Sequence, residues 1–232
     1  MSERNIILVP AYEPDDNLIN LVQNLSKEEL DIIIVDDGSG REYKGVFDKC
    51  KDKAKVISYN DNKGKGYALK TGLQYIKYSY QEPYIIVTMD CDGQHTIKDA
   101  KRLIKECSLN RNTLYLGKRI RSKKTPLRSR MGNAITRFVY RVTSGLDVYD
   151  TQTGLRAFSD ELVDYLLKIE GDRFEYEMNV LLKCAKDKVP IKEIEIETIY
   201  IDNNSKSHFN AFTDSYLIYK NILGSTFSKD KH

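Results

Sequence analysis

Short apolar runs alternate with amphipathic segments through the first half of this chain, and this alternation constrains the fold more than any other feature. The runs are rich in β-branched residues and bounded by polar turns, as is typical of strands buried on both faces. They lie at residues 6–9, 32–35, 56–58, 84–89 and 114–116. Segments with helical spacing separate them, at residues 18–25, 67–78 and 97–107. The sequence therefore predicts an α/β fold with a mostly parallel central sheet flanked by helices.

The second half of the chain has a different pattern. Helical spacing predicts helices at residues 131–143, 161–169 and 175–185. Residues 191–201, IKEIEIETIYI, alternate apolar and polar side chains, which predicts a small additional β element with one buried and one solvated face.

The C-terminal stretch FNAFTDSYLIYKNIL has apolar residues at helical spacing. We predict an amphipathic helix that packs on the domain through its large apolar side chains, and a helix lying on a membrane surface stays open as the alternative. The side chains that would pack are Phe209, Phe212, Tyr216 and Ile222.

Composition indicates one globular domain spanning residues 1–232. Hydrophobic residues make up 41% of the chain, charged residues make up 31%, and the net charge is +3, which excludes a disordered chain and disfavours a nucleic-acid-binding one. The four cysteines form no C-x-x-C pair, so we expect reduced cysteines in a cytoplasmic protein. No stretch approaches the roughly 20 apolar residues of a spanning helix, so any membrane contact is expected to be peripheral or supplied by a membrane protein partner.

Polar residues follow three of the predicted strands at the point where each strand ends. The sequence reads Ala11-Tyr12-Glu13 after the first strand and Asp36-Asp37-Gly38-Ser39 after the second. Asp90 and Asp92 follow the fourth. Ligands of open α/β sheets bind at the carboxyl ends of the strands, so this edge is the predicted ligand site.

Asp90 and Asp92 are separated by one residue, so on an extended chain their carboxylates project to the same side, roughly 6.5 Å apart. Such hard oxygen donors suit Mg²⁺ or Mn²⁺, and Gln94 adds a neutral oxygen. For this pair alone, an exposed polar turn is the favoured interpretation. An EF-hand loop is excluded, because His95 and Lys101 stand where it requires Gly and Glu.

The stretch DDGS after the second strand has two interpretations. Asp, Gly and Ser form turns, and an aspartate in this place also accepts hydrogen bonds from a base or ribose in many nucleotide sites. The stretch NKGKGYALKTG is neither a P-loop nor a dinucleotide fingerprint. Residues 63–66 of this stretch, taken together with DDGS and with Asp90 and Asp92 as a metal-binding pair, indicate a nucleoside diphosphate site.

The ordered set VPAYEPD, IIIVDDGS, NKGKGYALKTG, MDCDGQH, LGKR and DTQTGLRAF resembles the family 2 glycosyltransferases of GT-A (Rossmann-like) fold, in the branch of the dolichyl- or polyprenyl-phosphate hexose synthases. The resemblance covers about residues 4–209. It implies a nucleotide-binding half at about 1–117 and an acceptor-binding half at about 118–232.

The resemblance implies roles for residues of the first half. Asp90, Asp92 and Gln94 match the metal and diphosphate cluster, with Asp92 also assigned to catalysis. The nucleotide-sugar donor is assigned to a larger set, at the strand ends and in the glycine-rich stretch. That set is Pro10, Ala11, Tyr12, Glu13, Asp36, Asp37, Lys63, Lys65, Gly66, Asp90 and Cys91. The first motif departs from the usual P-x-Y-N-E, since Glu13 and Pro14 follow Tyr12 directly.

In the second half, Arg119 matches the G-x-R step, where arginine meets a donor or acceptor phosphate, and is assigned to catalysis. The acceptor is assigned to residues of two further motifs. They are Arg128, Ser129, Arg130, Asp150, Thr153, Gly154 and Arg156. An arginine that the synthases often carry before a late Ser-Lys motif is absent, because the chain reads YIDNNSKSHF there.

Residues 118–130 contain seven Lys or Arg residues and no acid. A solvated basic loop is the default interpretation, but its place beside the predicted site favours an anionic acceptor or an anionic membrane surface. Nucleic acid is disfavoured because the stretch lacks interleaved aromatic residues.

The predicted activity is metal-dependent transfer of a hexose from a UDP- or GDP-sugar, inverting as the family implies, most directly to a polyprenyl phosphate at the inner membrane surface. A phosphate acceptor is already ionised and needs no general base. For a glycan hydroxyl, the alternative acceptor, Glu175 is the candidate base, and Glu177 matches a carboxylate of the lipid-phosphate branch. Both are equally well explained as helix-start carboxylates. A sugar-nucleotide pyrophosphorylase and a non-catalytic nucleotide-sugar-binding module are the remaining alternatives.

Overall fold

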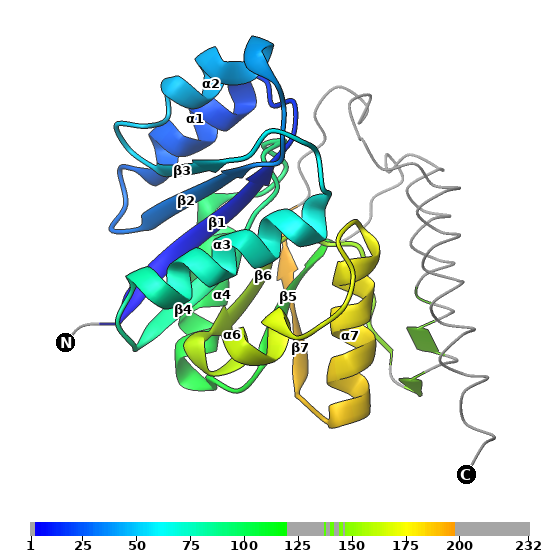
Figure 1. Cartoon of the computed structure of the whole chain (residues 1–232). Helices are drawn as coiled ribbons and strands as arrows, with labels where there is room; N and C mark the ends of the chain where they lie inside the picture. Colours follow the sequence, from blue (N-terminus) through cyan, green and yellow to red (C-terminus); the bar gives the residue numbers. More distant parts are fainter. Residues whose placement is uncertain (1–2, 120–136, 138–139, 142–143, 146, 198–232) are drawn as a thin grey trace.

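The computed structural model describes residues 3–119, 137, 140–141, 144–145 and 147–197. Within them, one seven-stranded sheet has the order β3-β2-β1-β4-β6-β5-β7 (Figure 1). The strands are β1 Arg4–Ala11, β2 Asp31–Asp36, β3 Lys55–Ser58, β4 Tyr84–Thr88, β5 Leu114–Arg119, β6 Arg156–Ser159 and β7 Ile191–Ile196. The helices are α1 Asp16–Leu25, α2 Lys44–Asp48, α3 Lys65–Ser79, α4 Ile97–Leu109, α6 Asp160–Leu167 and α7 Glu175–Asp187, with a 3-10 turn η1 at Arg41–Tyr43.

The sheet is mixed but mostly parallel, which confirms the predicted fold class. β1 pairs in parallel with β2 and β4, β2 with β3, and β5 with β7. β6 runs antiparallel between β4 and β5. Strand β6 was not predicted, because its sequence RAFS has only two apolar residues between Arg156 and Ser159 and so contains no apolar run. The expected additional β element is β7, which joins the main sheet as an edge strand rather than standing apart from it.

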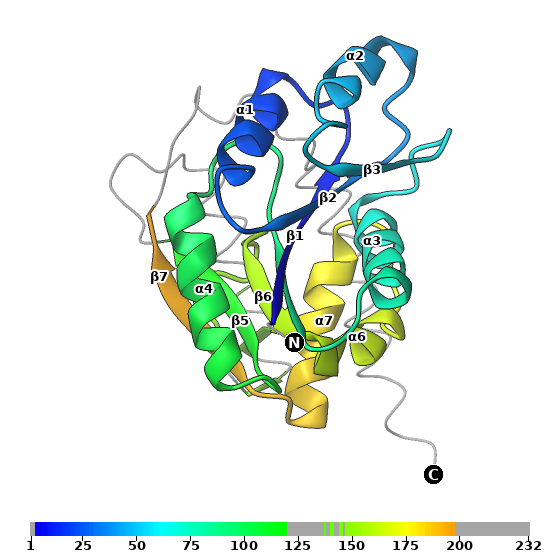
Figure 2. The ribbon, with the colours of Figure 1, turned by 90° about the vertical axis from the view of Figure 1, so that its left-hand side faces the viewer.

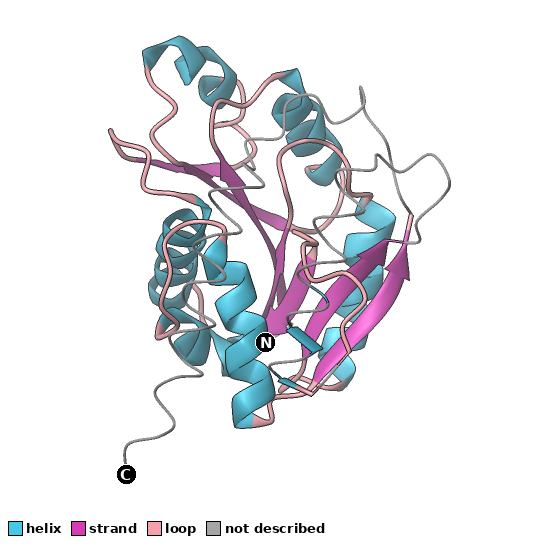
Figure 3. Cartoon of the chain, turned by 90° about the vertical axis from the view of Figure 1, so that its right-hand side faces the viewer, coloured by secondary structure: helices cyan, strands magenta, loops and turns pink. Residues whose placement is uncertain are grey.

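Two hydrophobic cores lie on the two faces of the sheet. In β1, Ile6 and Leu8 point to one core, and Ile7 and Val9 point to the other. Helices α3, α6 and α7 cover the first face, whereas α1, α2 and α4 cover the second (Figures 2 and 3). Because both faces are covered, β1, β2 and β4 each contain a run of consecutive apolar residues, which is why they appear in the sequence as continuous runs.

Local sequence fixes how several helices begin. Asp15 caps α1 by accepting a hydrogen bond from the backbone N–H of Asn17 at 3.0 Å. Thr96 caps α4 in the same way through the N–H of Asp99, also at 3.0 Å. This second cap follows directly after the Asp-Cys-Asp-Gly-Gln-His stretch. The start of α4 therefore fixes one end of the loop that carries the predicted metal ligands.

The predicted helix at 131–143 lies mostly outside the described residues, and the predicted C-terminal helix lies wholly outside them. Cys50, Cys107 and Cys184 are buried and Cys91 is half-buried, and none of the four is in a disulfide, while the reduced state stays a prediction. In the part of the chain that the structure describes, none of the helices combines the length and apolar character needed to cross a bilayer.

Candidate functional site

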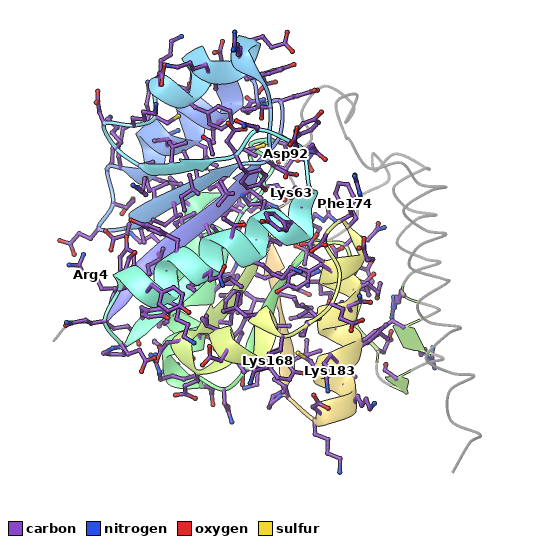
Figure 4. All side chains as sticks on the ribbon, viewed as in Figure 1. Arg4, Lys63, Asp92, Lys168, Phe174 and Lys183 are labelled. Carbon is purple, nitrogen blue, oxygen red and sulfur yellow. The ribbon has the colours of Figure 1, made fainter. Side chains whose placement is uncertain are left out.

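The carboxyl ends of β1, β2 and β4 meet at one edge of the sheet. Backbone hydrogen bonds continue past the strands there, from Asp37 N–H to the carbonyl of Ala11 at 2.8 Å and from Met89 N–H to that of Leu8 at 3.0 Å. Figure 4 shows Asp92 and Lys63 at this edge, whereas Arg4, at the start of β1, lies at the opposite end of the sheet. The segments predicted to bind a nucleotide are therefore brought together.

A chain of ion pairs crosses this edge. The Lys65 ammonium, at the first residue of α3, lies 2.8 Å from Oδ1 of Asp90 and 2.9 Å from Oε2 of Glu177 on α7. Arg156 on β6 lies 3.6 Å from the other oxygen of Glu177. The side chains of Lys65 and Glu177 are 15% and 12% exposed, so water screens these pairs less than surface pairs. Two helices and the end of β4 are thus tied together by charge.

The two predicted metal ligands have different electrostatic surroundings. Burial alone would raise the pKa of Asp90, but Lys65 and His95 outweigh it and hold that pKa well below its usual range. Burial, followed by the negative charge of Asp90, raises the pKa of Asp92. The N–H of Gln94 donates to Oδ1 of Asp92 at 3.0 Å. Asp92 therefore carries a carboxylate whose negative charge a cation would stabilise.

The donors at this place fit a hard divalent cation. Asp90 and Asp92 supply carboxylate oxygens of the kind that Mg²⁺ and Mn²⁺ prefer. Gly154 leaves just enough room for Asp90, because a Cβ there would fall 2.1 Å from Oδ2 and 2.5 Å from Oδ1. No group of three His, Cys, Asp or Glu side chains arranged to hold a metal occurs among the described residues. A cation held by one or two carboxylates keeps the remaining coordination positions for water and phosphate oxygens.

We expect Gly154→Ala to weaken Mn²⁺ binding by about tenfold, because the new methyl group displaces the Asp90 carboxylate from the position that Lys65 holds. Titration of Mn²⁺ monitored by electron paramagnetic resonance measures this. Gly45→Ala is the matched control, since a Cβ at Gly45 meets nothing within 4 Å. An unchanged Mn²⁺ affinity in Gly154→Ala would show that the cation does not use Asp90.

Asp37 organises the loop that leads into α3. Its side chain accepts hydrogen bonds from the hydroxyl of Tyr59 at 2.7 Å and the amide of Asn62 at 3.0 Å. It also accepts from the backbone N–H groups of Lys63 at 2.9 Å and Gly64 at 2.8 Å. Asp37 is 3% exposed. Both carboxylate oxygens are therefore engaged within the protein, and the predicted contact of Asp37 with a base or ribose stays a prediction.

The loop after β1 is held against the loop after β2. Ser39 accepts a hydrogen bond from the N–H of Glu13 at 2.9 Å, and its own N–H donates to Asp36 at the same distance. Pro10 and Ala11 are the last residues of β1. A hydrogen bond with Glu13 raises the pKa of Tyr12, so Tyr12 stays a neutral phenol. The predicted base-binding residues are thus neighbours in space.

Arg119, at the end of β5, forms a two-pronged ion pair with Asp150. Its Nε and Nη2 lie 2.7 Å and 3.0 Å from the two carboxylate oxygens. Glu193 on β7 in turn accepts hydrogen bonds from the backbone N–H groups of Tyr149 and Asp150, each at 2.9 Å. The fully buried Asp150 therefore positions Arg119, and Nη1 takes no part in the pair. Glu193 is a supporting residue that sequence reasoning missed, since a carboxylate in an alternating strand reads as a solvated residue.

The Thr153-Gly154-Leu155-Arg156 segment is buried, and its polar groups contact the protein itself. Thr88 donates a hydrogen bond to the carbonyl of Gly154 at 2.8 Å. Arg156 donates to the carbonyls of Thr153 at 3.0 Å and Glu177 at 2.9 Å. These contacts hold the segment behind Asp90. Arg128, Ser129 and Arg130, predicted to bind the acceptor, lie outside the described residues.

The two candidate bases on α7 have different surroundings. Glu175 accepts hydrogen bonds from the backbone N–H groups of Asp172 at 3.0 Å and Arg173 at 3.2 Å, as a helix-start carboxylate does. Glu177 belongs to the ion-pair chain with Lys65 and Arg156. The structure therefore brings Glu177, rather than Glu175, into contact with the Asp90 cluster.

His95 is a second residue that the predicted site set omitted. Its Nε2 lies 3.6 Å from Oδ2 of Asp90, and its Nδ1 is buried with no hydrogen-bond partner in the described part of the chain. It also lines a hollow of about 490 Å³ between α1 and the start of α4, together with Asn17 and Gly93. His95 is the last residue of MDCDGQH, and the predicted set for that stretch contained only oxygen ligands of a hard cation.

Comparison with known proteins shows which protein family this chain matches. A family model described as Glycosyl transferase family 2 matches residues 6–167. The UDP-N-acetylglucosamine–dolichyl-phosphate N-acetylglucosaminyltransferase of Methanococcus voltae is 30% identical, over 94% of this chain and 94% of that protein. The dolichyl-phosphate beta-glucosyltransferase of Dictyostelium discoideum is 24% identical, over 94% of this chain and 72% of that protein.

Among solved structures, glucosyl-3-phosphoglycerate synthase from Mycobacterium tuberculosis, in complex with Mn²⁺, UDP and glucosyl-3-phosphoglycerate, superposes with a TM-score of 0.62. The identity is 18%, and the match covers 98% of this chain and 80% of that one. At this level of identity the likeness concerns the fold, which agrees with the GT-A arrangement expected from the sequence.

Proposed function

The chain belongs to glycosyl transferase family 2 and is a glycosyltransferase, and from that premise we propose that it transfers a hexose from a nucleoside diphosphate sugar to a polyprenyl phosphate. The single observation that carries the donor half of this proposal is the pair Asp90 and Asp92. They stand at the carboxyl end of β4, beside the Lys65 ammonium and the loops that end β1 and β2. Nucleotides bind at this edge of open α/β sheets.

The site residues divide the work of donor binding. The loops after β1 and β2 accept the base and ribose, and Asp90 and Asp92 hold a divalent cation, Mg²⁺ or Mn²⁺. When bound, such a cation neutralises the negative charge that develops on the departing diphosphate. Lys65 keeps the Asp90 carboxylate in place, and Gly154 gives that carboxylate room. Inversion, which the family resemblance implies, would require the face of the sugar opposite the diphosphate to stay open to attack.

Three observations support a phosphate as the acceptor. Two relatives that each match 94% of this chain carry names that state dolichyl phosphate. A phosphate oxygen is already ionised near neutral pH and needs no general base. The two candidate bases at the start of α7 are both engaged within the protein, Glu175 by backbone N–H groups and Glu177 by Lys65. Asp150 holds Arg119 by two hydrogen bonds, and we propose that this guanidinium meets an acceptor phosphate.

A lipid acceptor also implies a place of action. We expect a cytoplasmic protein that works at the inner membrane surface, where the basic stretch at 118–130 would contact anionic headgroups. A membrane protein partner stays a prediction from the sequence.

The test is a donor and acceptor screen on the purified protein. Release of nucleoside diphosphate is measured for UDP- and GDP-hexoses, with Mn²⁺ or Mg²⁺, in the presence and absence of undecaprenyl phosphate in detergent micelles. We expect release that requires both the cation and the lipid phosphate and that produces one hexosyl lipid. If only a glycan hydroxyl accepts the sugar, the acceptor assignment is wrong and Glu175 becomes the candidate base.

A further inference from the structure

Lys65 occupies an unusual place for a lysine in a site that is to receive a cation. Its ammonium contacts Asp90, one of the two proposed cation ligands, at 2.8 Å and Glu177 at 2.9 Å. Asp92 makes no ion pair among the described residues, and the negative charge of Asp90 acts on its carboxylate. A cation that binds Asp90 therefore has to share that carboxylate with a positive charge already fixed in the protein.

The position of this ammonium is determined from several sides. Lys65 begins α3, and the preceding loop is fixed by the hydrogen bonds of Asp37 to the N–H groups of Lys63 and Gly64. Gly66 lies directly against α7, because a Cβ there would fall 2.5 Å from Cβ of Tyr176. The distance between α3 and α7 is thus set by backbone packing. Lys65 is consequently held between the two carboxylates rather than free to leave the site.

Two positive charges on one carboxylate repel each other, and partial burial strengthens that repulsion. A diphosphate brings negative charge that compensates both. On this ground we propose that Lys65 makes cation binding dependent on the nucleotide: the divalent cation binds weakly to the free enzyme and tightly together with the nucleoside diphosphate. This inference rests on the proposed function, since it concerns the same cation site. Lys65 is here a positioning residue that sets the order of binding.

Glu177 has a defined part in this arrangement. Its carboxylate takes a share of the Lys65 charge and so leaves Asp90 partly available to a cation. Arg156, at 3.6 Å, and the buried end of α7 hold Glu177 in place. When the Glu177 charge is removed, the Lys65 ammonium pairs with Asp90 alone. Glu177 therefore acts on the cation through Lys65, which gives it a role other than that of a general base.

Removal of the Lys65 charge and removal of the Glu177 charge should have opposite effects on the binding of Mn²⁺ without nucleotide. Lys65→Met removes the competing charge, and we expect about tenfold tighter binding of Mn²⁺ to the nucleotide-free protein. Glu177→Gln is expected to weaken it about threefold. In the Lys65→Met background, Glu177→Gln should change the Mn²⁺ affinity by less than about twofold, because the Lys65 ammonium through which Glu177 acts is absent.

The nucleotide gives a second readout. In the wild type, UDP should strengthen Mn²⁺ binding strongly, and by linkage Mn²⁺ should strengthen UDP binding by the same factor. In Lys65→Met we expect this factor to be about tenfold smaller. Mn²⁺ affinity is measured by electron paramagnetic resonance of the free ion, with and without UDP, and with GDP in parallel.

Two control variants separate this effect from general damage. Lys65→Arg keeps the positive charge and should leave Mn²⁺ affinity close to that of the wild type. Lys77→Met removes a lysine from the other end of α3, where it pairs with Asp164, and should leave Mn²⁺ affinity unchanged. Far-UV circular dichroism checks that each variant is folded.

The outcomes distinguish the two proposals. If the wild type binds Mn²⁺ neither alone nor with UDP or GDP, the metal part of the proposed function fails. If the wild type binds Mn²⁺ with a nucleotide but Lys65→Met leaves both the affinity and the coupling factor unchanged, the role of Lys65 is refuted. If Glu177→Gln lowers the Mn²⁺ affinity equally in the wild type and in Lys65→Met, the action of Glu177 through Lys65 is refuted.

Discussion

Replacement of Asp92 by Asn should lower kcat/KM for hexose transfer by about a thousandfold, without a comparable loss of stability. The substitution keeps the shape of the side chain and removes its charge. That charge lies beside Asp90, and both burial and Asp90 raise the pKa of Asp92, so the carboxylate is placed where a cation would stabilise it. Initial rates are measured with the donor that the screen selects.

Asp52→Asn is the control for this prediction. Asp52 is an exposed aspartate in the turn before β3, so its replacement should leave both the rate and the thermal unfolding midpoint unchanged. An Asp92→Asn protein that is folded and fully active would mean that the assignment of the metal site to this loop is wrong. A variant that loses activity together with its fold would be distinguished by circular dichroism.

Replacement of Asp37 by Ala should lower the free energy of unfolding by about 3 to 5 kcal/mol. The 3% exposed carboxylate accepts hydrogen bonds from Tyr59, Asn62 and the N–H groups of Lys63 and Gly64. Alanine leaves these donors without an acceptor in a place that water reaches poorly. Urea denaturation followed by circular dichroism measures the change.

Asp36→Ala is the matched comparison, because the neighbouring carboxylate accepts the N–H of Ser39 at 2.9 Å. We expect a loss of about 1 kcal/mol for this single hydrogen bond. Equal losses for the two variants would contradict the view that Asp37 organises the loop at residues 59–64. The Asp37 variant should also bind nucleotide weakly, since the same loop leads into Lys65.

Family and fold were accessible from the sequence because their signals are local. Buried parallel strands produce continuous apolar runs, and the motifs at the strand ends stand in a fixed order along the chain. The expected α/β sheet, the family and the enzyme class are confirmed. Strand β6 was not predicted, because Arg156 and Ser159 enclose only two apolar residues and the strand therefore shows no apolar run.

The site was predictable as a list of residues but not as a set of contacts. Asp90 and Asp92 could be selected from their spacing, and Lys65 from its glycine-rich stretch. The ion pair between Lys65 and Glu177 joins residues more than a hundred positions apart, which no local pattern reports. The support of Arg119 by Asp150 and of the Asp150 backbone by Glu193 likewise depends on strand order.

Sequence by itself determined which chemical groups stand at the carboxyl edge of the sheet, because strand periodicity and turn residues fix where each strand ends. Only the tertiary structure decided what each carboxylate does. Asp37 holds a loop, Glu175 begins a helix, and Asp90 shares its charge with a lysine from another helix. The physical reason is that an ionised side chain takes its role from the donors and charges within a few ångström, and packing sets those neighbours.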